Sequence, residues 1–275
     1  MIEYRGKTYA TGNNPAAEKL CSASRWPVQR FNRPEIEGLI ADKHRLRARN
    51  QFGPDWCYDQ GPIGSCNGVS AAGALRRSLV RAGVGDCPPL SGEWLYSRIN
   101  DGKDKGSLLD DGMAQLLKGV APWNPKHQHK YKPRDFTKKD TDQAKRFKAL
   151  ECYGVDSELQ LATGLSLGFV GVVAVHVGGN DWFKMDRNKI IIDSPQNKGP
   201  GNHAVIVDDI WVINGELCFD HMGSWSPDVH DAGRAFLTWG RHLKSTNKSH
   251  YFYLVRAVNV DDPEDNIPEL KKGKK

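Results

Sequence analysis

The stretch that decides the fold reads Gln60-Gly61-Pro62-Ile63-Gly64-Ser65-Cys66-Asn67-Gly68. A helix is predicted to begin at Cys66 or just after it, because apolar residues recur at steps of three and four from Val69 to Ala82. A thiol attacks a carbonyl carbon only as a thiolate, and the N–H groups and dipole at a helix start favour that anion. Gly64 and Ser65 would keep the approach to the thiol narrow and open to a substrate backbone. The stretch therefore predicts a nucleophilic cysteine at the start of a helix.

The residues around the thiol also offer donors for an oxyanion. The side-chain amide of Gln60 is suited to bind the negative oxygen that develops during acyl transfer, and the backbone N–H of Cys66 would be the second donor. An isolated cysteine at a helix start is more often a small buried apolar residue. The prediction of a nucleophile therefore depends on these neighbours.

The stretch resembles the signature of the papain family of cysteine peptidases, Gln-Gly-x-x-Gly-Ser-Cys, which has its glutamine six residues before the nucleophile. The family also has a histidine at the head of a strand, followed by Ala-Val, about 130–150 residues after the cysteine. His203-Ala204-Val205-Ile206-Val207 is similar to that strand, and His203 follows Cys66 by 137 residues (203 − 66). The resemblance implies that His203 takes the thiol proton, that Cys66 attacks a peptide carbonyl and that Gln60 stabilises the oxyanion.

The resemblance extends over most of the chain, from about Trp56 to Val258. Leu90-Ser91-Gly92-Glu93-Trp94-Leu95 is similar to the family's Leu-Ser-Glu-Gln-x-Leu helix start. Asp110-Asp111-Gly112-Met113 stands where the family has Asn-Gly-Gly before a helix. The resemblance implies that Gly112 lets a substrate backbone lie against the protein, as do Gly64 and Ser65.

The main departure from the family falls in a second motif. Ser224-Trp225 resembles part of the family's Asn-Ser-Trp-Gly motif, and Trp225 is expected to pack beside the histidine at the edge of the cleft. The asparagine that orients the histidine falls on Gly223 here, and glycine has no side chain for that task. The residue after the nucleophile is Asn67 rather than an aromatic residue. A weaker enzyme is expected more than an inactive one, since cysteine and histidine form the minimal unit.

A β-hairpin is predicted around Asn214-Gly215, a pair typical of the two-residue type I′ turn. Its strands are His203 to Ile213 and Glu216 to Trp225. Pairing counted outward from the turn places His203 opposite about Ser226, with Ser224 on the same side of the strand. Ser224 and Ser226 are therefore the candidate groups that hold the second ring nitrogen of the histidine.

Helical periodicity dominates the first half of the chain, and strands dominate the second half. The expected fold is α+β and papain-like, with a helical lobe, a β-barrel-like lobe and the active cleft between them. Residues 1–50 are predicted to be a polar N-terminal arm, 51–258 the peptidase domain and 259–275 a Lys-rich tail. Within the domain, the helical lobe covers about 51–155 and the β lobe about 156–258.

Composition is that of an ordinary globular protein, with 39% apolar and 26% charged residues among 275. A formal net charge of +6 is too small for a dedicated nucleic-acid binder. The longest apolar run, Leu167 to Val177, is too short to span a bilayer, and no signal peptide is recognisable, so a cytoplasmic location is expected. The six cysteines form no Cys-x-x-Cys pair, which argues against a zinc site. The expected mechanism needs no metal or cofactor.

Two other functions fit parts of the sequence. The lost asparagine, the polar arm and the lysine tail are consistent with a papain-like scaffold of a bacteriophage virion, or of another assembly, with weak or no activity. The arm and tail would then contact the protein partners of that assembly. The other alternative is an amide hydrolase that cleaves cell-wall material. The leading interpretation is a cysteine endopeptidase whose partner is a peptide or protein substrate.

Overall fold

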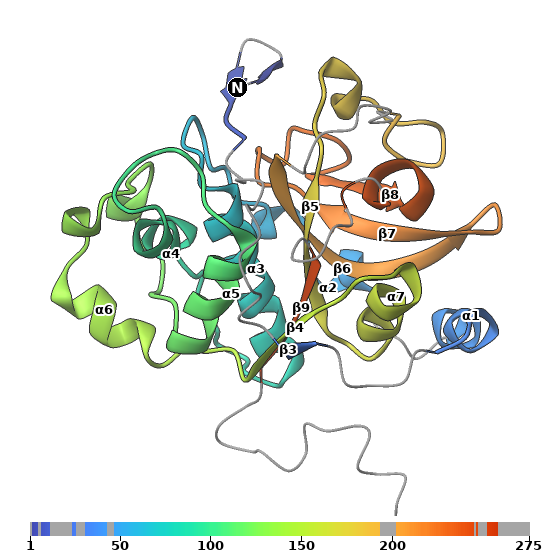
Figure 1. The fold of residues 1–275 in the computed structure, drawn as a ribbon, viewed down its shortest axis with the longest axis horizontal. Helices are drawn as coiled ribbons and strands as arrows, with labels where there is room; N and C mark the ends of the chain where they lie inside the picture. The colour runs from blue at the N-terminus through green and yellow to red at the C-terminus, as the bar shows by residue number, and fades with distance from the viewer. Residues whose placement is uncertain are drawn as a thin grey trace, which may run out of the picture.

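The computed structural model describes residues 2–4, 7–11, 24–25, 31–42, 47–192, 202–244, 246 and 252–257. The predicted Lys-rich tail and parts of the predicted arm lie outside these residues. Helices pack on one side of α3 (Cys66–Arg81) and a sheet packs on the other (Figure 1). Leu75 and Val205 are fully buried in the hydrophobic core that joins the two layers. Within the described ranges, no helix is long and apolar enough to cross a bilayer.

The helical side consists of α3 and three shorter helices, α4 (Gly92–Ile99), α5 (Leu109–Lys118) and α6 (Lys138–Ala144) (Figure 1). The hydroxyl of Ser91 accepts the N–H of Trp94 and so caps α4, which explains why that helix begins where it does. The helix predicted to begin at Cys66 is confirmed and ends at Arg81.

Glycines let α3 approach its neighbours closely. A Cβ on Gly68 would lie 2.4 Å from the carbonyl oxygen of Gly92 at the start of α4. On the opposite side, a Cβ on Gly73 would lie 2.7 Å from a methyl group of Ile206 in the sheet. A side chain at position 68 would meet backbone, and one at position 73 would displace the end of Ile206, so both glycines allow α3 to pack closely between the two layers.

The second layer, as far as the structure describes it, is a seven-stranded sheet in the order β3-β4-β9-β5-β6-β7-β8. Neighbouring strands are antiparallel except β3 and β4. α7 (Glu158–Ser166) contacts β5 and β6, and α1 (Arg33–Ala41) packs against α7. The strands are β3 (Ser24–Arg25), β4 (Glu151–Gly154), β5 (Val170–Val175), β6 (His203–Ile213), β7 (Glu216–Met222), β8 (Arg234–Thr238) and β9 (Phe252–Arg256).

β6 and β7 form the predicted hairpin, and its turn has the predicted geometry. Asn214 and Gly215 both have positive φ, 51° and 76°, as a type I′ turn requires. The pairing keeps the register of the turn as far as Asp209↔Asp220 and then shifts by one residue, to Val207↔His221. Asp208 is the extra residue, so β6 carries a β-bulge at that point.

The bulge places the carboxylate of Asp208 in the core. Arg77 of α3 donates to it from Nε at 2.9 Å, and Arg234 of β8 donates from both terminal nitrogens at 2.8 and 2.9 Å. All three residues are buried. Burial lowers the pKa of Arg77 to about 10, so this guanidinium stays charged at neutral pH. Arg234 also donates to the buried carboxylate of Asp220 at 3.3 Å, so two buried cations face two buried carboxylates and join α3 to the sheet.

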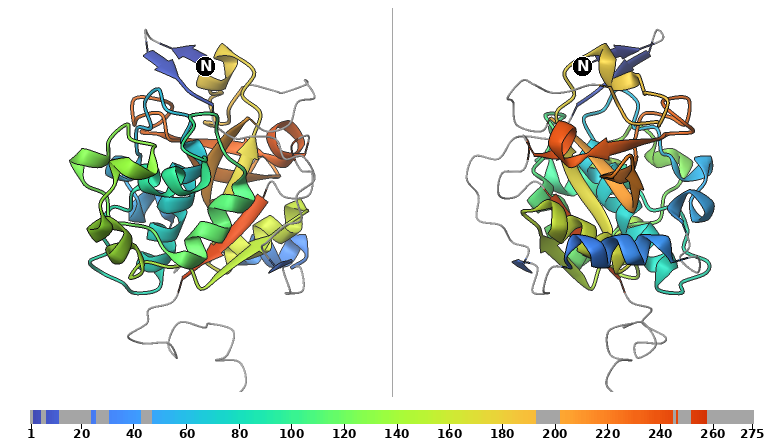
Figure 2. Two further views of the ribbon diagram at one scale, coloured as in Figure 1. Left: turned by 60° about the vertical axis from the view of Figure 1, so that its left-hand side comes forward. Right: turned by 90° about the vertical axis from the view of Figure 1, so that its right-hand side faces the viewer.

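The N-terminal residues are more structured than the predicted polar arm. β1 (Ile2–Tyr4) and β2 (Lys7–Tyr9) pair with each other, and β1 contacts η4 (Asn180–Phe183). Figure 2 shows this hairpin in blue at one end of the molecule. Asn32 caps α1, whose Ile36 and Ile40 are buried. The remaining short segments are α2 (Ala48–Gln51), η1 (Pro54–Trp56), η2 (Pro125–His127), η3 (Pro133–Asp135) and η5 (Trp239–Leu243).

Candidate active site

Cys66 is the first residue of α3, as the sequence predicts, and it is fully buried. Its Sγ accepts a hydrogen bond from the backbone N–H of Ala204 at 3.4 Å. One turn further along α3, the hydroxyl of Ser70 donates to the carbonyl oxygen of Ala204 at 2.9 Å. These two contacts fix the start of α3 against the start of β6, where His203 lies.

His203 is buried and held flat against an indole ring. The rings of His203 and Trp225 are stacked, with centroids 4.0 Å apart and 24° between their planes, which confirms the expected packing. Among the described residues, neither ring nitrogen of His203 has a hydrogen-bond partner. Burial lowers the pKa of His203 to about 3, so the ring is neutral at physiological pH. The imidazole is therefore next to the Cys66 segment but is not hydrogen-bonded to the thiol.

Gln60 is buried, and both N–H groups of its amide are already used. One donates to the carbonyl oxygen of Ile63 at 2.8 Å and the other to the carbonyl oxygen of Ala10 at 3.1 Å. The indole N–H of Trp225 donates to the same Ala10 oxygen at 3.3 Å. A backbone carbonyl of the N-terminal segment thus accepts a hydrogen bond from the amide that the sequence predicts as an oxyanion donor. The site is closed in this structure.

Ser224 and Ser226 do not orient the histidine, which corrects the prediction made for both residues. The hydroxyl of Ser224 donates to Oε1 of Gln60, and the hydroxyl of Ser226 donates to Asp228 at 3.2 Å. Neither hydroxyl contacts a ring nitrogen of His203.

The cause of this error is the β-bulge at Asp208. A shift of one residue in register exchanges the two faces of a strand. Counting on from the shifted pairs places His203 opposite Trp225 rather than Ser226. The stacking of the two rings agrees with that register.

The residues expected to border the cleft lie inside the protein. Gly64 and Ser65 are buried, and the N–H of Gly64 donates to Asp104 at 2.9 Å. Gly112 is buried within α5, where a Cβ would lie 2.6 Å from Oδ1 of Asn67. Gly112 therefore accommodates the side chain of Asn67, and its contact with a substrate backbone stays a prediction.

The position of the missing asparagine has room for a larger residue. A Cβ on Gly223 would come no closer than 3.9 Å to a heavy atom, the carbonyl oxygen of Gly233. His221 lies two residues earlier and hence on the same face of the strand. Its Nδ1 donates to the carbonyl oxygen of Ala235 at 2.9 Å, and its Nε2 has no partner among the described residues. His221 was not singled out from the sequence, although its position two residues before Gly223 could have indicated that it lies on the same face of the strand.

Four other thiols have pKa values well above that of a free cysteine. Burial raises the pKa of Cys57, Cys152 and Cys218 to about 12 and that of Cys87 to about 11. None of the five cysteines that the structure describes forms a disulfide. In the same residues, no group of three or more His, Cys, Asp or Glu side chains is placed to hold a metal ion.

The fold is that of papain-like cysteine proteases, which confirms the predicted fold class, whereas no protein-family model and no curated protein sequence matches the chain. Xylellain, a cysteine protease from Xylella fastidiosa, is similar over 94% of this chain and 100% of its own, with a TM-score of 0.65 and 18% identity. Procathepsin L 3 from the larval midgut of Tenebrio molitor is similar over 90% and 76%, with a TM-score of 0.63 and 18% identity. Bromelain from Ananas comosus, in complex with the E64 inhibitor, is similar over 73% and 93%, with a TM-score of 0.56 and 17% identity.

Proposed function

We propose that the chain is a cysteine peptidase in which Cys66 is the nucleophile, His203 the base and Gln60 an oxyanion donor. His203 takes the proton of the thiol, and the thiolate adds to the peptide carbonyl carbon. The amide of Gln60 and the N–H of Cys66 stabilise the oxyanion. His203 then gives its proton to the leaving amine as the C–N bond breaks, and water hydrolyses the thioester.

The observation that carries this proposal is the contact between the starts of α3 and β6. Sγ of Cys66 accepts the N–H of Ala204, the residue that follows His203. The nucleophile and its base are thus brought to adjoining ends of two rigid elements, 137 residues apart in the chain (203 − 66). Several solved structures with this fold are cysteine proteases, which supports the same chemistry here.

The closed geometry supports a latent form of such an enzyme. The Ala10 carbonyl takes the hydrogen bonds of Gln60 and Trp225, and burial keeps His203 neutral. Some of the similar structures are proforms, among them the Tenebrio molitor procathepsin and a procathepsin B from Trypanosoma congolense. The segment around Ala10 is proposed to be displaced before substrate binds.

The direct test is hydrolysis of fluorescein-labelled casein by the full chain and by a chain that lacks residues 1–11. We expect the shorter chain to hydrolyse casein, because its oxyanion donors are no longer occupied. Cys66→Ala and His203→Ala should each reduce the rate to background. Cys87→Ala, which removes a buried thiol outside the site, is the matched control and should keep the rate.

Two outcomes of this experiment would reject the peptidase proposal. Hydrolysis of peptidoglycan but not of casein, again dependent on Cys66, would indicate the cell-wall hydrolase. Hydrolysis of neither substrate by either chain, with no reaction of Cys66 towards alkylating reagents, would favour the scaffold protein of an assembly.

Gly223→Asn is expected to increase kcat/KM of the shorter chain for a peptide substrate on the order of 10-fold. The amide would stand on the strand face that carries Trp225, whose ring is stacked on that of His203, and a Cβ there meets no heavy atom closer than 3.9 Å. A hydrogen bond from one ring nitrogen would keep the other directed at the thiol. The measurement is initial rates over a range of peptide concentrations.

The control for this change is Gly223→Ala, which fills the same space without an amide. It should leave kcat/KM within a factor of two or so of the parent, since no new hydrogen bond to the ring is formed. Equal rates for the alanine and asparagine variants would contradict the orienting role assigned to position 223.

A further inference from the structure

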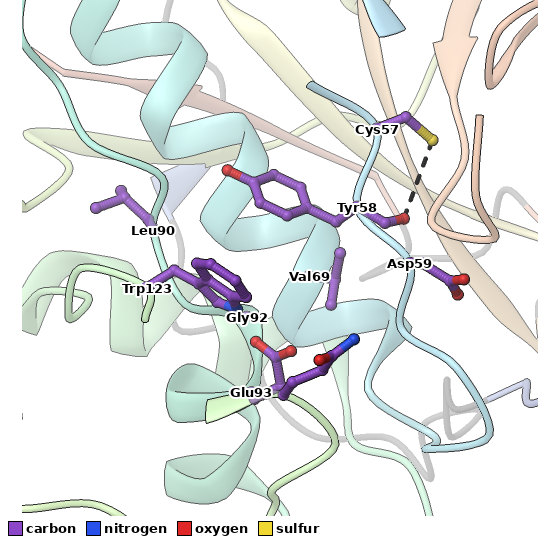
Figure 3. Close-up of a pocket in the computed structure, with 9 residues that line it drawn as sticks. Cys57, Tyr58, Asp59, Val69, Leu90, Gly92, Glu93 and Trp123 are labelled. Carbon is purple, nitrogen blue, oxygen red and sulfur yellow. Dashed lines mark hydrogen bonds between the residues drawn. The ribbon is translucent and has the colours of Figure 1, made fainter. Parts of the chain in front are cut away.

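A cavity of about 190 Å³ lies outside the proposed active site. Its walls come from the segment 57–59, from α3 and from the start of α4 (Figure 3). Cys66, His203 and Gln60 do not line it. The volume is smaller than that of pockets for drug-sized ligands, which measure about 300–1,000 Å³. A ligand of this cavity would therefore be small, or would be a single side chain of a larger molecule.

Glu93 is the charged group of the cavity that is most deeply buried, with 7% of its surface exposed. Figure 3 shows its carboxylate pointing toward the ring of Trp123. Buried carboxylates are uncommon unless a partner compensates them. Within the described residues, no salt bridge reaches Glu93. A cation that compensates the charge of Glu93 would therefore have to be part of a ligand that enters the cavity.

A series of polar contacts leads from Asn124 through His127 and Ser91 to Glu93. Oδ1 of Asn124 accepts the N–H of Lys126 at 2.9 Å, so the amide NH₂ of Asn124 faces Nε2 of His127, 2.8 Å away. Nδ1 of the same ring lies 3.0 Å from the hydroxyl oxygen of Ser91. Asp140 lies 3.4 Å from Nε2, but burial outweighs this carboxylate and lowers the pKa of His127.

The hydroxyl of Ser91 is the group in this series that contacts Glu93. It donates to Oε2 of Glu93 at 3.3 Å, and its oxygen accepts the N–H of Trp94. Glu93 therefore receives hydrogen bonds from the protein and presents acceptor oxygens to the cavity. Such a site suits a ligand that donates hydrogen bonds and carries positive charge.

The other walls are suited to the same kind of ligand. Tyr58 and Trp123 contribute aromatic rings, whose faces attract cations, and Val69 contributes an apolar surface for a short aliphatic chain (Figure 3). Asp59 lies at the exposed edge, where its carboxylate points away from Glu93 and accepts the N–H of Gly61 at 2.9 Å (Figure 3). Arg76 donates to the hydroxyl of Tyr58 at 3.1 Å and is not part of the lining.

We propose that this cavity binds a primary ammonium group on a short aliphatic chain, with Glu93 as its counter-ion and the rings of Tyr58 and Trp123 as its walls. The ammonium group could belong to a free alkylamine or to a lysine side chain of a polypeptide. The proposal does not depend on the peptidase function, because none of the residues proposed for catalysis takes part.

Isothermal titration calorimetry on the full chain at pH 8 tests the proposal, with n-butylammonium chloride as the probe and n-butanol as its uncharged counterpart. We expect saturable binding of the amine and none of the alcohol. Glu93→Gln should weaken amine binding at least about tenfold, since a charge-assisted hydrogen bond is lost. Glu216→Gln, which changes an exposed carboxylate at the distant β6–β7 turn, should bind as the parent does.

The pH dependence gives a second readout, which needs no variant. Burial raises the pKa of Glu93 to about 7, and hydrogen bonds from Ser91 and Trp123 only partly oppose this. The carboxylate is then mostly protonated at pH 6, whereas an alkylammonium stays charged, so affinity should fall about tenfold between pH 8 and pH 6. Burial raises the pKa of Tyr58, and raises that of Cys57 to about 12, so neither group changes charge in this range.

Binding of the alcohol as tightly as the amine would overturn the proposal, as would unchanged binding by Glu93→Gln or an affinity that does not fall between pH 8 and pH 6. A third probe, Nα-acetyl-lysine N-methylamide, separates the two sources. Tighter binding of this probe than of butylammonium would identify a polypeptide lysine as the ligand. Equal or weaker binding would identify a free amine.

Discussion

Removal of residues 1–11 is expected to increase the rate of alkylation of Cys66 by iodoacetamide about 10- to 100-fold at pH 6.5. The carbonyl of Ala10 accepts hydrogen bonds from Gln60 and Trp225, each worth on the order of 1 kcal/mol, and a tenfold rate corresponds to about 1.4 kcal/mol. Once water reaches His203, its pKa should return toward the ordinary value of about 6.5. A thiolate–imidazolium pair could then form at this pH.

The other cysteines provide an internal control for this measurement. Burial holds the pKa of four of them, Cys57, Cys87, Cys152 and Cys218, at about 11 or 12, so they should react slowly in both chains. Cys21 lies outside the described residues and is best replaced by serine in both chains. Peptide mapping by mass spectrometry gives the rate at each thiol. Equal rates at Cys66 in the two chains would show that the N-terminal segment does not control access to it.

Asp208→Ala is expected to lower the free energy of unfolding by about 3–5 kcal/mol, the usual cost of removing one partner from a buried ion pair. Without the carboxylate, the guanidinium groups of Arg77 and Arg234 remain buried with much less compensation. Urea unfolding followed by tryptophan fluorescence measures the change. The matched control is Asp181→Ala, which breaks an exposed pair with Lys184 and should cost less than about 1 kcal/mol.

The effect of Asp208→Ala should also depend on pH. Burial alone would raise the pKa of Asp208, but the charges of Arg234 and Arg77 hold it well below the usual range. A depressed pKa in the folded state adds stability above the unfolded value of about 3.9, and this stability is lost as the pH falls below it. The difference between parent and variant should therefore shrink between pH 5 and pH 2. A constant difference, or a loss of less than about 1 kcal/mol at pH 7, would contradict the role assigned to the carboxylate.

Local signals were sufficient to predict much of the fold. The Asn214-Gly215 pair specified the turn, and the apolar run before it specified β6 with the bounds that the structure has. The stripe after Cys66 specified α3. β4 (Glu151–Gly154) was not predicted, because it has only four residues and is ordered by pairing with β9, about 100 residues later in the chain. Such pairing leaves little trace in the segment itself.

In the candidate site, too, features set by local sequence were predicted, and features that depend on distant residues were not. Cys66 and His203 stand at the starts of α3 and β6, as predicted, because each position is part of a local motif. The partner of the histidine was predicted wrongly, since the bulge at Asp208 depends on Arg77 and Arg234, which are distant in sequence. The contact of Gln60 with Ala10 could not be predicted at all, because the acceptor is a backbone carbonyl that any residue would offer.

The β-bulge has a consequence for how this protein can change length. Residues can be gained or lost in matched pairs at the tip of the hairpin without moving His203. The reason is that the bulge at Asp208 determines which face of the sheet each later side chain takes. A single residue gained or lost between His203 and Asp208 would instead turn the imidazole to the opposite surface of the sheet. Insertions, whether natural or engineered, should therefore be tolerated at Asn214-Gly215. They should not be tolerated on the short stretch that precedes the bulge.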